Sequence, residues 1–392
     1  MVKFIKYPAT GVIPILIPLL VFLFCIQGNS QPINVVKDSV YSPVLKEVRP
    51  YWVYLPDSYN DSLNWYAKYP VIYLLDGDIR IQALARTVQA QSSGVYGAYA
   101  MPETIIVGIG NTNRVRDLTP THSLQMEGKD QAFLTPSSGG DSFLKFIKSE
   151  LIPSIEKKYR TSPYRVFIGH SFGGLTVLHT LFTTPDTFQA YVAIDPSLWW
   201  DGNLLVKKAQ DFFIHTPLKN KDLYLAQANT LAPEDTINNH YEAIQQFHTY
   251  LESRNYSNVR WNYTFYPDDS HGTVPFIACY DALRFIFKNY AIRVDRISGP
   301  DDMKKIFDSF SAEKNVRFYP PPKLVYSLAQ YHLSKGEKNF ALQYFQMLQD
   351  GYPQSAMTHF GLSEYWKQNG NSAKADEYLK KSKGVNPKIK AP

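Results

Sequence analysis

Short apolar runs recur along the first three quarters of the chain and alternate with segments whose apolar residues have helical spacing. The runs are continuous rather than alternating, which is typical of strands buried on both faces of a parallel sheet. Strands and helices in this order predict an α/β fold with a mostly parallel central sheet. The expected strands lie at 49–56, 69–78, 103–110, 166–168, 188–194, 222–229 and 259–266, and the expected helices at 79–91, 141–159, 172–182, 241–254 and 276–290.

The last quarter of the chain follows a different pattern. After three prolines at 320–322, five positions echo one another at a spacing of 34 residues, the period of tetratricopeptide repeats with two helices each. We therefore expect the α/β domain over 32–292, a linker and helix over 293–319, and a small all-α domain of tetratricopeptide-like helical repeats over 320–392. A plain helical cap is the alternative for the last segment. The echoing pairs are Leu328 and Leu362, Gly336 and Gly370, Ala341 and Ala375, Phe345 and Leu379, and Pro353 and Pro387.

Residues 1–31 have the pattern of a secretory signal peptide. Lys3 and Lys6 form a basic start, Gly11–Ile26 is an uncharged apolar run, and small and polar residues follow at 28–31. The pattern predicts export to the periplasm or the extracellular space. An uncleaved membrane anchor is the alternative, although two prolines within the apolar run disfavour a spanning helix.

Composition and charge narrow the class of partner. The formal net charge of +6 falls to +4 once Lys3 and Lys6 are removed, and no basic run stands out, so we expect no nucleic-acid partner. The sequence shows no His-x-x-x-His pair with a glutamate, no cysteine cluster, no phosphate-binding glycine loop and no dinucleotide fingerprint. We therefore expect neither a metal nor a cofactor.

The stretch with the clearest chemistry is Gly169-His170-Ser171-Phe172-Gly173, which follows an expected strand and opens an expected helix. Gly-x-Ser-x-Gly in this context is typical of a nucleophile elbow, where a strained turn lifts the serine hydroxyl out of the sheet. The glycines let strand and helix approach closely. A structural glycine-rich turn with a buried serine is the alternative reading.

A serine nucleophile needs a base, a group that orients the base, and donors for an oxyanion. His271 is the predicted base, because it lies after Ser171 in a loop between the last expected strand and the last expected helix. For the acid we favour Asp235, with Glu234 second and Asp195 third. A helix N-cap is the structural alternative for Asp235. The predicted oxyanion donors are the backbone N–H groups of Phe172, which follows the serine, and of Asp78, which follows the first buried strand.

Five segments together resemble the putative esterase family of α/β-hydrolases, which includes esterase D, feruloyl esterases, mycolyltransferases and the enterobactin esterases. The resemblance covers about residues 40 to 290, and the Arg-x-Arg-Asp-Leu-Thr-Pro loop and the Ser-Leu-Trp-Trp run are closest to the siderophore-esterase branch. The segments are 71–78, 108–120, 138–144, 168–174 and 196–201.

The resemblance implies an α/β-hydrolase fold with Ser171 as nucleophile, His271 as base and backbone donors at Asp78 and Phe172. It also implies that four side chains flank the acyl or aromatic part of a substrate. Salt bridges for the arginines and core packing for the tryptophans are the structural alternatives. These four are Arg114, Arg116, Trp199 and Trp200.

The sequence thus predicts an exported serine carboxylic-ester hydrolase that works through an acyl-enzyme on siderophore-type or feruloyl-type esters, whether small molecules or glycan-linked. Acyl transfer to a sugar or lipid alcohol is the alternative within enzymes, and peptide cleavage is a further one. A catalytically idle binding module, with the helical repeats holding a protein partner, is the alternative outside enzymes.

Overall fold

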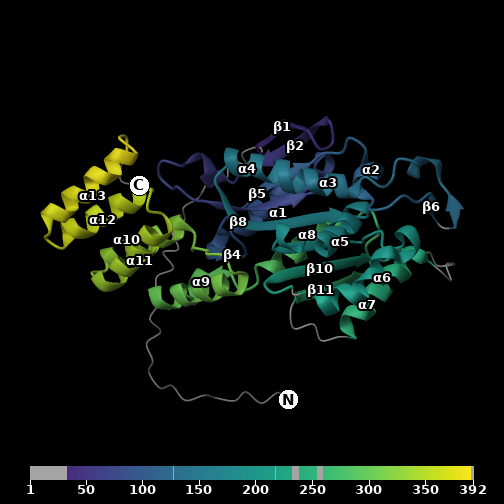
Figure 1. The fold of residues 1–392 in the computed structure, drawn as a ribbon. Helices are drawn as coiled ribbons and strands as arrows, with labels where there is room; N and C mark the ends of the chain where they lie inside the picture. Colours follow the sequence, from purple (N-terminus) through teal and green to yellow (C-terminus); the bar gives the residue numbers. More distant parts are fainter. Residues whose placement is uncertain (1–32, 127, 217, 232–237, 254–258, 390–392) are drawn as a thin grey trace, which may run out of the picture. The chain divides into compact units, whose positions relative to one another are not determined.

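The computed structural model describes residues 33–126, 128–216, 218–231, 238–253 and 259–389. At its centre lies one eight-stranded sheet in the order β1-β2-β5-β3-β8-β9-β10-β11 (Figure 1). The pairs β1–β2 and β2–β5 are antiparallel, and every other pair is parallel. The strands are β1 (Val35–Ser42), β2 (Glu47–Tyr54), β3 (Tyr69–Leu74), β5 (Ile105–Ile109), β8 (Thr161–His170), β9 (Ala190–Ile194), β10 (Lys221–Ala228) and β11 (Val259–Tyr266).

Two small antiparallel pairs lie outside this sheet: β4 (Ala98–Tyr99) with β12 (Ile292–Arg293), and β6 (Gln125–Met126) with β7 (Lys129–Asp130). The central strands are buried from end to end: every residue of β3, β5 and β9 is buried. Continuous apolar runs therefore do mark strands covered on both faces, as the sequence predicted.

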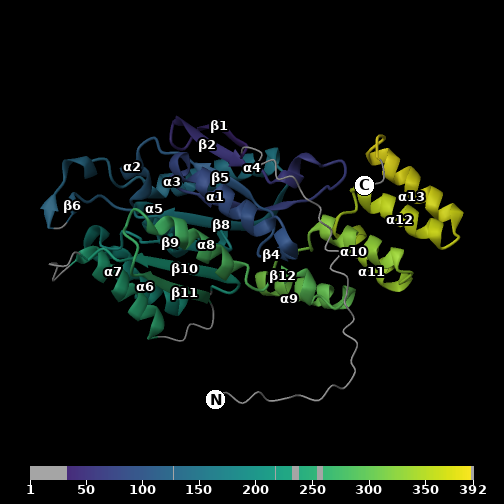
Figure 2. The same cartoon turned by 180° about the vertical axis from the view of Figure 1, so that it is seen from behind.

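Helices connect the strands and pack in two groups, with α1 against α8, and α5 against α2 and α6 (Figure 2). The amphipathic segment at 141–159, in which Pro153 predicts a kink or a break, is α3, a π-helical turn at Ile147–Leu151, and then α4, with Pro153 in its first turn. The helix α6 has no counterpart among the sequence predictions. The helices are α1 (Gly77–Ser92), α2 (Arg114–Leu118), α3 (Gly140–Phe146), α4 (Ile152–Lys158), α5 (Phe172–Thr183), α6 (Trp200–His215), α7 (Asn239–Glu252) and α8 (Val274–Ile286).

The C-terminal part is a run of helices. After α9 (Pro300–Lys314) come two hairpins, α10 (Pro322–Ser334) with α11 (Lys338–Gly351), and α12 (Ala356–Gln368) with α13 (Ser372–Val385). The first helices of the hairpins begin at residues 322 and 356, and the second helices at 338 and 372, so both steps are 34 residues. The sequence echo thus coincides with a repeated helical hairpin, while its assignment to the tetratricopeptide class stays a prediction.

Residues 34–392 form one compact unit. The hairpins contact the α/β part through the loop before β3, where the rings of Trp65 and Tyr326 lie 5.6 Å apart and the N–H of Ala356 donates to the carbonyl of Leu63 at 3.2 Å. The Ser355 hydroxyl donates to a carbonyl of the same loop. The two hairpins therefore pack against the α/β part, which fits the low stability of so few repeats alone.

The predicted signal segment, residues 1–31, lies outside the described residues. Among the helices that are described, none combines the length and the apolar character that crossing a membrane requires.

Candidate active site

Ser171 lies at the sharp turn between β8 and α5. Its backbone angles, φ 61° and ψ −121°, fall where residues other than glycine are rarely found. A Cβ atom on Gly169 would lie 2.3 Å from the carbonyl oxygen of Gly173, and one on Gly174 would lie 2.9 Å from the side chain of Pro196. The turn therefore needs glycine at positions 169 and 174, and it holds Ser171 at the carboxyl edge of the sheet.

Two helices begin beside this turn. Phe172 is the first residue of α5, and Asp78 lies in the first turn of α1, where backbone N–H groups have no acceptor within their own helix. A Cβ atom on Gly173 would lie 3.7 Å from Oδ2 of Asp76, the left-handed residue that precedes α1. The two helix starts are thus neighbours, an arrangement that suits an anion held by both.

His271 lies in the loop between β11 and α8, as the sequence predicted. Its Nδ1 lies 2.5 Å from Oδ2 of Asp195, and its ring centroid lies 4.4 Å from that of His170. Asp195 directly follows β9, whose last residue, Ile194, accepts a 3.0 Å hydrogen bond from the N–H of Ser171. The structure therefore gathers Ser171, Asp195 and His271 at one edge of the sheet.

The Asp195 carboxylate is fully buried and saturated with donors. Its Oδ1 accepts the N–H of Ala228 at 3.0 Å, and its Oδ2 accepts both His271 and Nε2 of His240, the latter at 3.0 Å. Burial alone would raise the pKa of Asp195, but the hydrogen bonds from His240, His271 and Ala228 outweigh it and the pKa is lowered. Asp195 is thus held as an anion against the imidazole of His271.

The other predicted acids, Asp235 and Glu234, lie outside the described residues. Among the described residues, the carboxylate that contacts His271 is that of Asp195, which the sequence ranked third. His240, at the start of α7, also contacts Asp195, and the sequence analysis did not identify that contact. No local motif announces that contact, since the two residues are 45 positions apart and meet only through the fold.

His170 lies on the other side of His271. Its Nδ1 is 3.0 Å from a guanidinium nitrogen of Arg80, which can only donate, so the neutral ring carries its hydrogen on Nε2. Burial lowers the pKa of His170 to about 3, and the charges of His271 and Arg80 act in the same direction. Ligand atoms of His170, Asp195 and His271 lie within 4.8 Å of one another, a spacing that could hold a metal ion. In this state neither ring nitrogen of His170 offers a free lone pair, and we assign no metal to the cluster.

The Ser171 hydroxyl has a close neighbour that the sequence analysis did not single out. Its Oγ lies 3.3 Å from Oγ of the buried Ser197, whose N–H donates to the Ser171 carbonyl at 3.1 Å. In this conformation the hydroxyl is engaged with Ser197 rather than with His271. Either hydroxyl can be the donor of this contact, so the Ser171 proton is free for His271 whenever Ser197 donates.

The two predicted substrate-binding arginines differ in their surroundings. Arg114 forms a bidentate pair with Asp76, at 2.8 and 3.0 Å, and its guanidinium lies 5.6 Å from the ring centre of Phe172. About a third of the Arg114 side chain stays exposed, 35%. Arg116 pairs with Glu47 at 2.6 Å, within a network that continues to a buried aspartate. Arg114 thus lies next to the residue that follows the nucleophile, whereas Arg116 fits the salt-bridge alternative.

The two predicted tryptophans also differ. Both rings flank Phe172, with centroids 6.0 Å away for Trp199 and 5.4 Å for Trp200. Trp200 is fully buried and its indole N–H donates to Thr121 at 3.1 Å, which fits the core alternative. Trp199 is half-buried, so part of its surface remains available beside the site.

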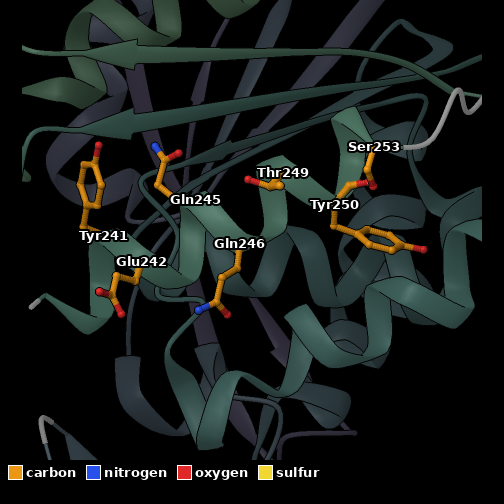
Figure 3. Close-up of a pocket in the computed structure, with 7 residues that line it drawn as sticks. All are labelled: Tyr241, Glu242, Gln245, Gln246, Thr249, Tyr250 and Ser253. Carbon is orange, nitrogen blue, oxygen red and sulfur yellow. The ribbon is translucent and has the colours of Figure 1, made fainter.

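A shallow surface hollow follows one face of α7 and ends at Ser253 (Figure 3). None of the predicted catalytic residues lines it, and we assign it no role. Its lining residues are Tyr241, Glu242, Gln245, Gln246, Thr249, Tyr250 and Ser253.

Two curated relatives are each similar to about two fifths of the chain. Ferri-bacillibactin esterase BesA of Bacillus subtilis is 36% identical over 172 residues, which are 41% of this chain and 59% of the relative. The siderophore enterobactin esterase of Emericella nidulans is 34% identical over 155 residues, which are 36% of this chain and 50% of the relative. The chain therefore spans half to three fifths of the length of these relatives.

Solved structures extend the likeness. The IroE-like serine hydrolase of Shewanella oneidensis superposes with a TM-score of 0.73 at 32% identity, covering 81% of this chain and 99% of that protein. The BES protein of Bacillus cereus, with a TM-score of 0.55 at 24% identity over 64% of this chain, shares the fold. The family model described as Putative esterase matches residues 42–249, which is more than half of the chain. The predicted α/β-hydrolase fold is thus confirmed, and the chain belongs to the Putative esterase family.

Proposed function

We propose that the protein is a serine carboxylic-ester hydrolase in which Ser171 is the nucleophile, His271 the general base and Asp195 the acid that orients it. The observation that carries the proposal is the 2.5 Å contact between Asp195 and Nδ1 of His271, beside a serine in a strained elbow. A carboxylate on Nδ1 fixes the tautomer whose Nε2 can accept a proton.

Each step of the proposed reaction uses a group described above. The Ser171 oxygen attacks the ester carbonyl and its proton passes to Nε2 of His271, while the N–H groups of Phe172 and Asp78 stabilise the oxyanion. The carbon–oxygen bond to the alcohol breaks, and His271 gives its proton to that alkoxide. Water, which gives a proton to His271, then attacks the acyl-enzyme, and the acid leaves as Ser171 regains its proton.

Siderophore-type esters are the substrate class that we favour, because one curated relative is named a siderophore enterobactin esterase and another a ferri-bacillibactin esterase. The exposed part of Arg114 offers a cation, and Trp199 an aromatic face, to an anionic or aromatic acyl group. Feruloyl-type esters share that chemistry and belong in the same test. We also propose export, supported by the signal-like pattern of residues 1–31.

The test is a panel of catecholate, feruloyl and simple aryl esters, together with a fluorophosphonate probe, applied to the natural protein and to Ser171→Ala. We expect hydrolysis and labelling by the natural protein and a loss of turnover of about 10⁴-fold or more in the variant. Ser197→Ala is the matched control and should still be labelled, because its hydroxyl is buried behind the nucleophile. A natural protein inert toward both esters and probe would contradict the proposal. Transfer to an added alcohol in place of water would point to an acyltransferase.

A further inference from the structure

Two imidazoles share one carboxylate oxygen at the proposed active site. Oδ2 of Asp195 accepts Nδ1 of His271 at 2.5 Å and Nε2 of His240 at 3.0 Å, and the two rings are nearly perpendicular, 88°, with centroids 5.1 Å apart. We propose that His240 is a positioning residue that divides the Asp195 carboxylate with His271 and thereby extends the action of His271 as a base to lower pH. This inference rests on the proposed function.

The fold holds His240 firmly against the carboxylate. It lies in the first turn of α7, where Oδ1 of the capping residue Asn238 accepts the N–H groups of His240 and Tyr241 at 3.0 and 3.1 Å. The Asn238 amide in turn donates to the carbonyl of Thr230 at 2.7 Å, just after β10. The cap thus fixes the backbone of His240, and the 3.0 Å hydrogen bond to Oδ2 of Asp195 orients its ring.

The hydrogens at this junction follow from elementary rules. An ionised carboxylate only accepts, so His271 carries a hydrogen on Nδ1 and His240 carries one on Nε2. His271 therefore keeps a lone pair on Nε2, where the reaction needs it. The carboxylate charge, however, is divided between two donors and supports a proton on His271 less strongly than it would alone.

His240 disfavours a proton on His271 whether the His240 ring is neutral or protonated. As a neutral donor it weakens the hold of Asp195 on an imidazolium at His271. As a cation it would repel that imidazolium across 5.1 Å. Removal of His240 should therefore make His271 easier to protonate, and the base would be lost at a higher pH.

The other charged and titratable groups that act on this cluster come from neighbouring elements. His170, at the end of β8, lies against His271 with Arg80 of α1 behind it. Tyr263 of β11 is close enough to Asp195 that the carboxylate, after burial, contributes to its raised pKa. Neither His170 nor Tyr263 shares Oδ2, so the direct competition with His271 belongs to His240.

The experiment compares His240→Phe with His240→Gln in the full-length protein. Phenylalanine fills the volume of the ring without a donor, whereas glutamine keeps a donor that does not titrate. We expect the acid limb of the kcat/KM profile to move up by about one pH unit in His240→Phe, and by much less in His240→Gln. His215→Phe, at the exposed end of α6, is the control and should leave the profile unchanged.

An NMR titration of the His271 ring in the same variants reads the same coupling without turnover. A shift of about one unit for His271 in His240→Phe, restored largely by His240→Gln, supports the inference. An unmoved His271 titration in an active His240→Phe protein overturns it and leaves the esterase proposal standing. An inactive natural protein with the His271 shift present would overturn the esterase proposal instead.

Discussion

Two buried aspartates at opposite ends of neighbouring strands solve the same physical problem in different ways. Asp195 follows β9 at the carboxyl edge of the sheet, and Asp222 lies at the start of β10, which pairs with β9 in parallel register. Both are buried. Asp195 is paired with two imidazoles, whereas Asp222 is paired with the ammonium of Lys314 at 2.6 Å and the guanidinium of Arg260 at 2.7 Å.

The difference lies in whether the partner can change its charge. Imidazole gains and loses a proton near neutral pH, while ammonium and guanidinium groups stay charged. The carboxylate with titratable partners can therefore stabilise a proton that an imidazole gains and then loses. The carboxylate with fixed cations can only hold two parts together, and here it binds α9, through Lys314, to the sheet. Under the proposed function, one edge of the sheet serves chemistry and the other serves stability.

The largest expected effect breaks the first of these pairs. In Asp195→Asn the side chain is neutral, so it stabilises a protonated His271 less, and its amide favours the wrong tautomer of that ring. We therefore expect kcat/KM for an ester substrate to fall by about 10³–10⁴-fold. Steady-state kinetics measure the loss, and circular dichroism should show an intact fold. The matched variant is Asp222→Asn, which should lower the denaturation midpoint and keep kcat per folded molecule. Equal losses of activity in both variants would contradict the division of roles.

Much of the fold was predictable, because the burial of parallel strands leaves a direct trace in the sequence. The longest exception is α6, whose first turn contains Asp201, Gly202 and Asn203, all at positive φ. A helix that opens on left-handed residues lacks the usual start signals, and the aromatic run before it was read as part of a substrate site. The hairpins of the C-terminal part were placed from their 34-residue echo alone.

The candidate site was predictable only where it is local. Five consecutive residues, 169–173, predict the elbow at Ser171, and the place of His271 after the last strand predicts its role as the base. The partner of His271 depends on the order of the strands in the sheet. Because β10 pairs with both β9 and β11, Asp195 after β9 reaches His271 after β11, 76 positions away. Residue spacing ranked Asp235 and Glu234 above Asp195, and only the fold shows that Asp195 contacts His271.

The second prediction breaks the structural pair. Lys314→Met removes the ammonium from a fully buried ion pair and leaves the carboxylate of Asp222 with one cation fewer, so we expect a loss of about 3 kcal/mol in the free energy of unfolding. Urea denaturation followed by fluorescence measures it. Lys304→Met, in the exposed pair with Asp308 on the same helix, should cost less than about 1 kcal/mol. Similar costs for both lysines would show that α9 is not held through Asp222.

The smallest effect concerns the proton balance at the carboxyl edge. Burial lowers the pKa of His170 to about 3, while an unfolded histidine titrates near 6.5. At a pH between these two pKa values, His170 is protonated in the unfolded chain and neutral in the folded protein. The free energy of unfolding therefore falls as the pH drops below about 6.5. From pH 6.5 to pH 5 this group should remove roughly 1.5 kcal/mol of the free energy of unfolding.

In His170→Gln that part of the pH dependence should vanish, whereas the variant His215→Gln, at an exposed position, should retain it. Urea denaturation at the two pH values measures the difference, and an equal pH dependence in His170→Gln and the natural protein would show that His170 takes up its proton in the folded state.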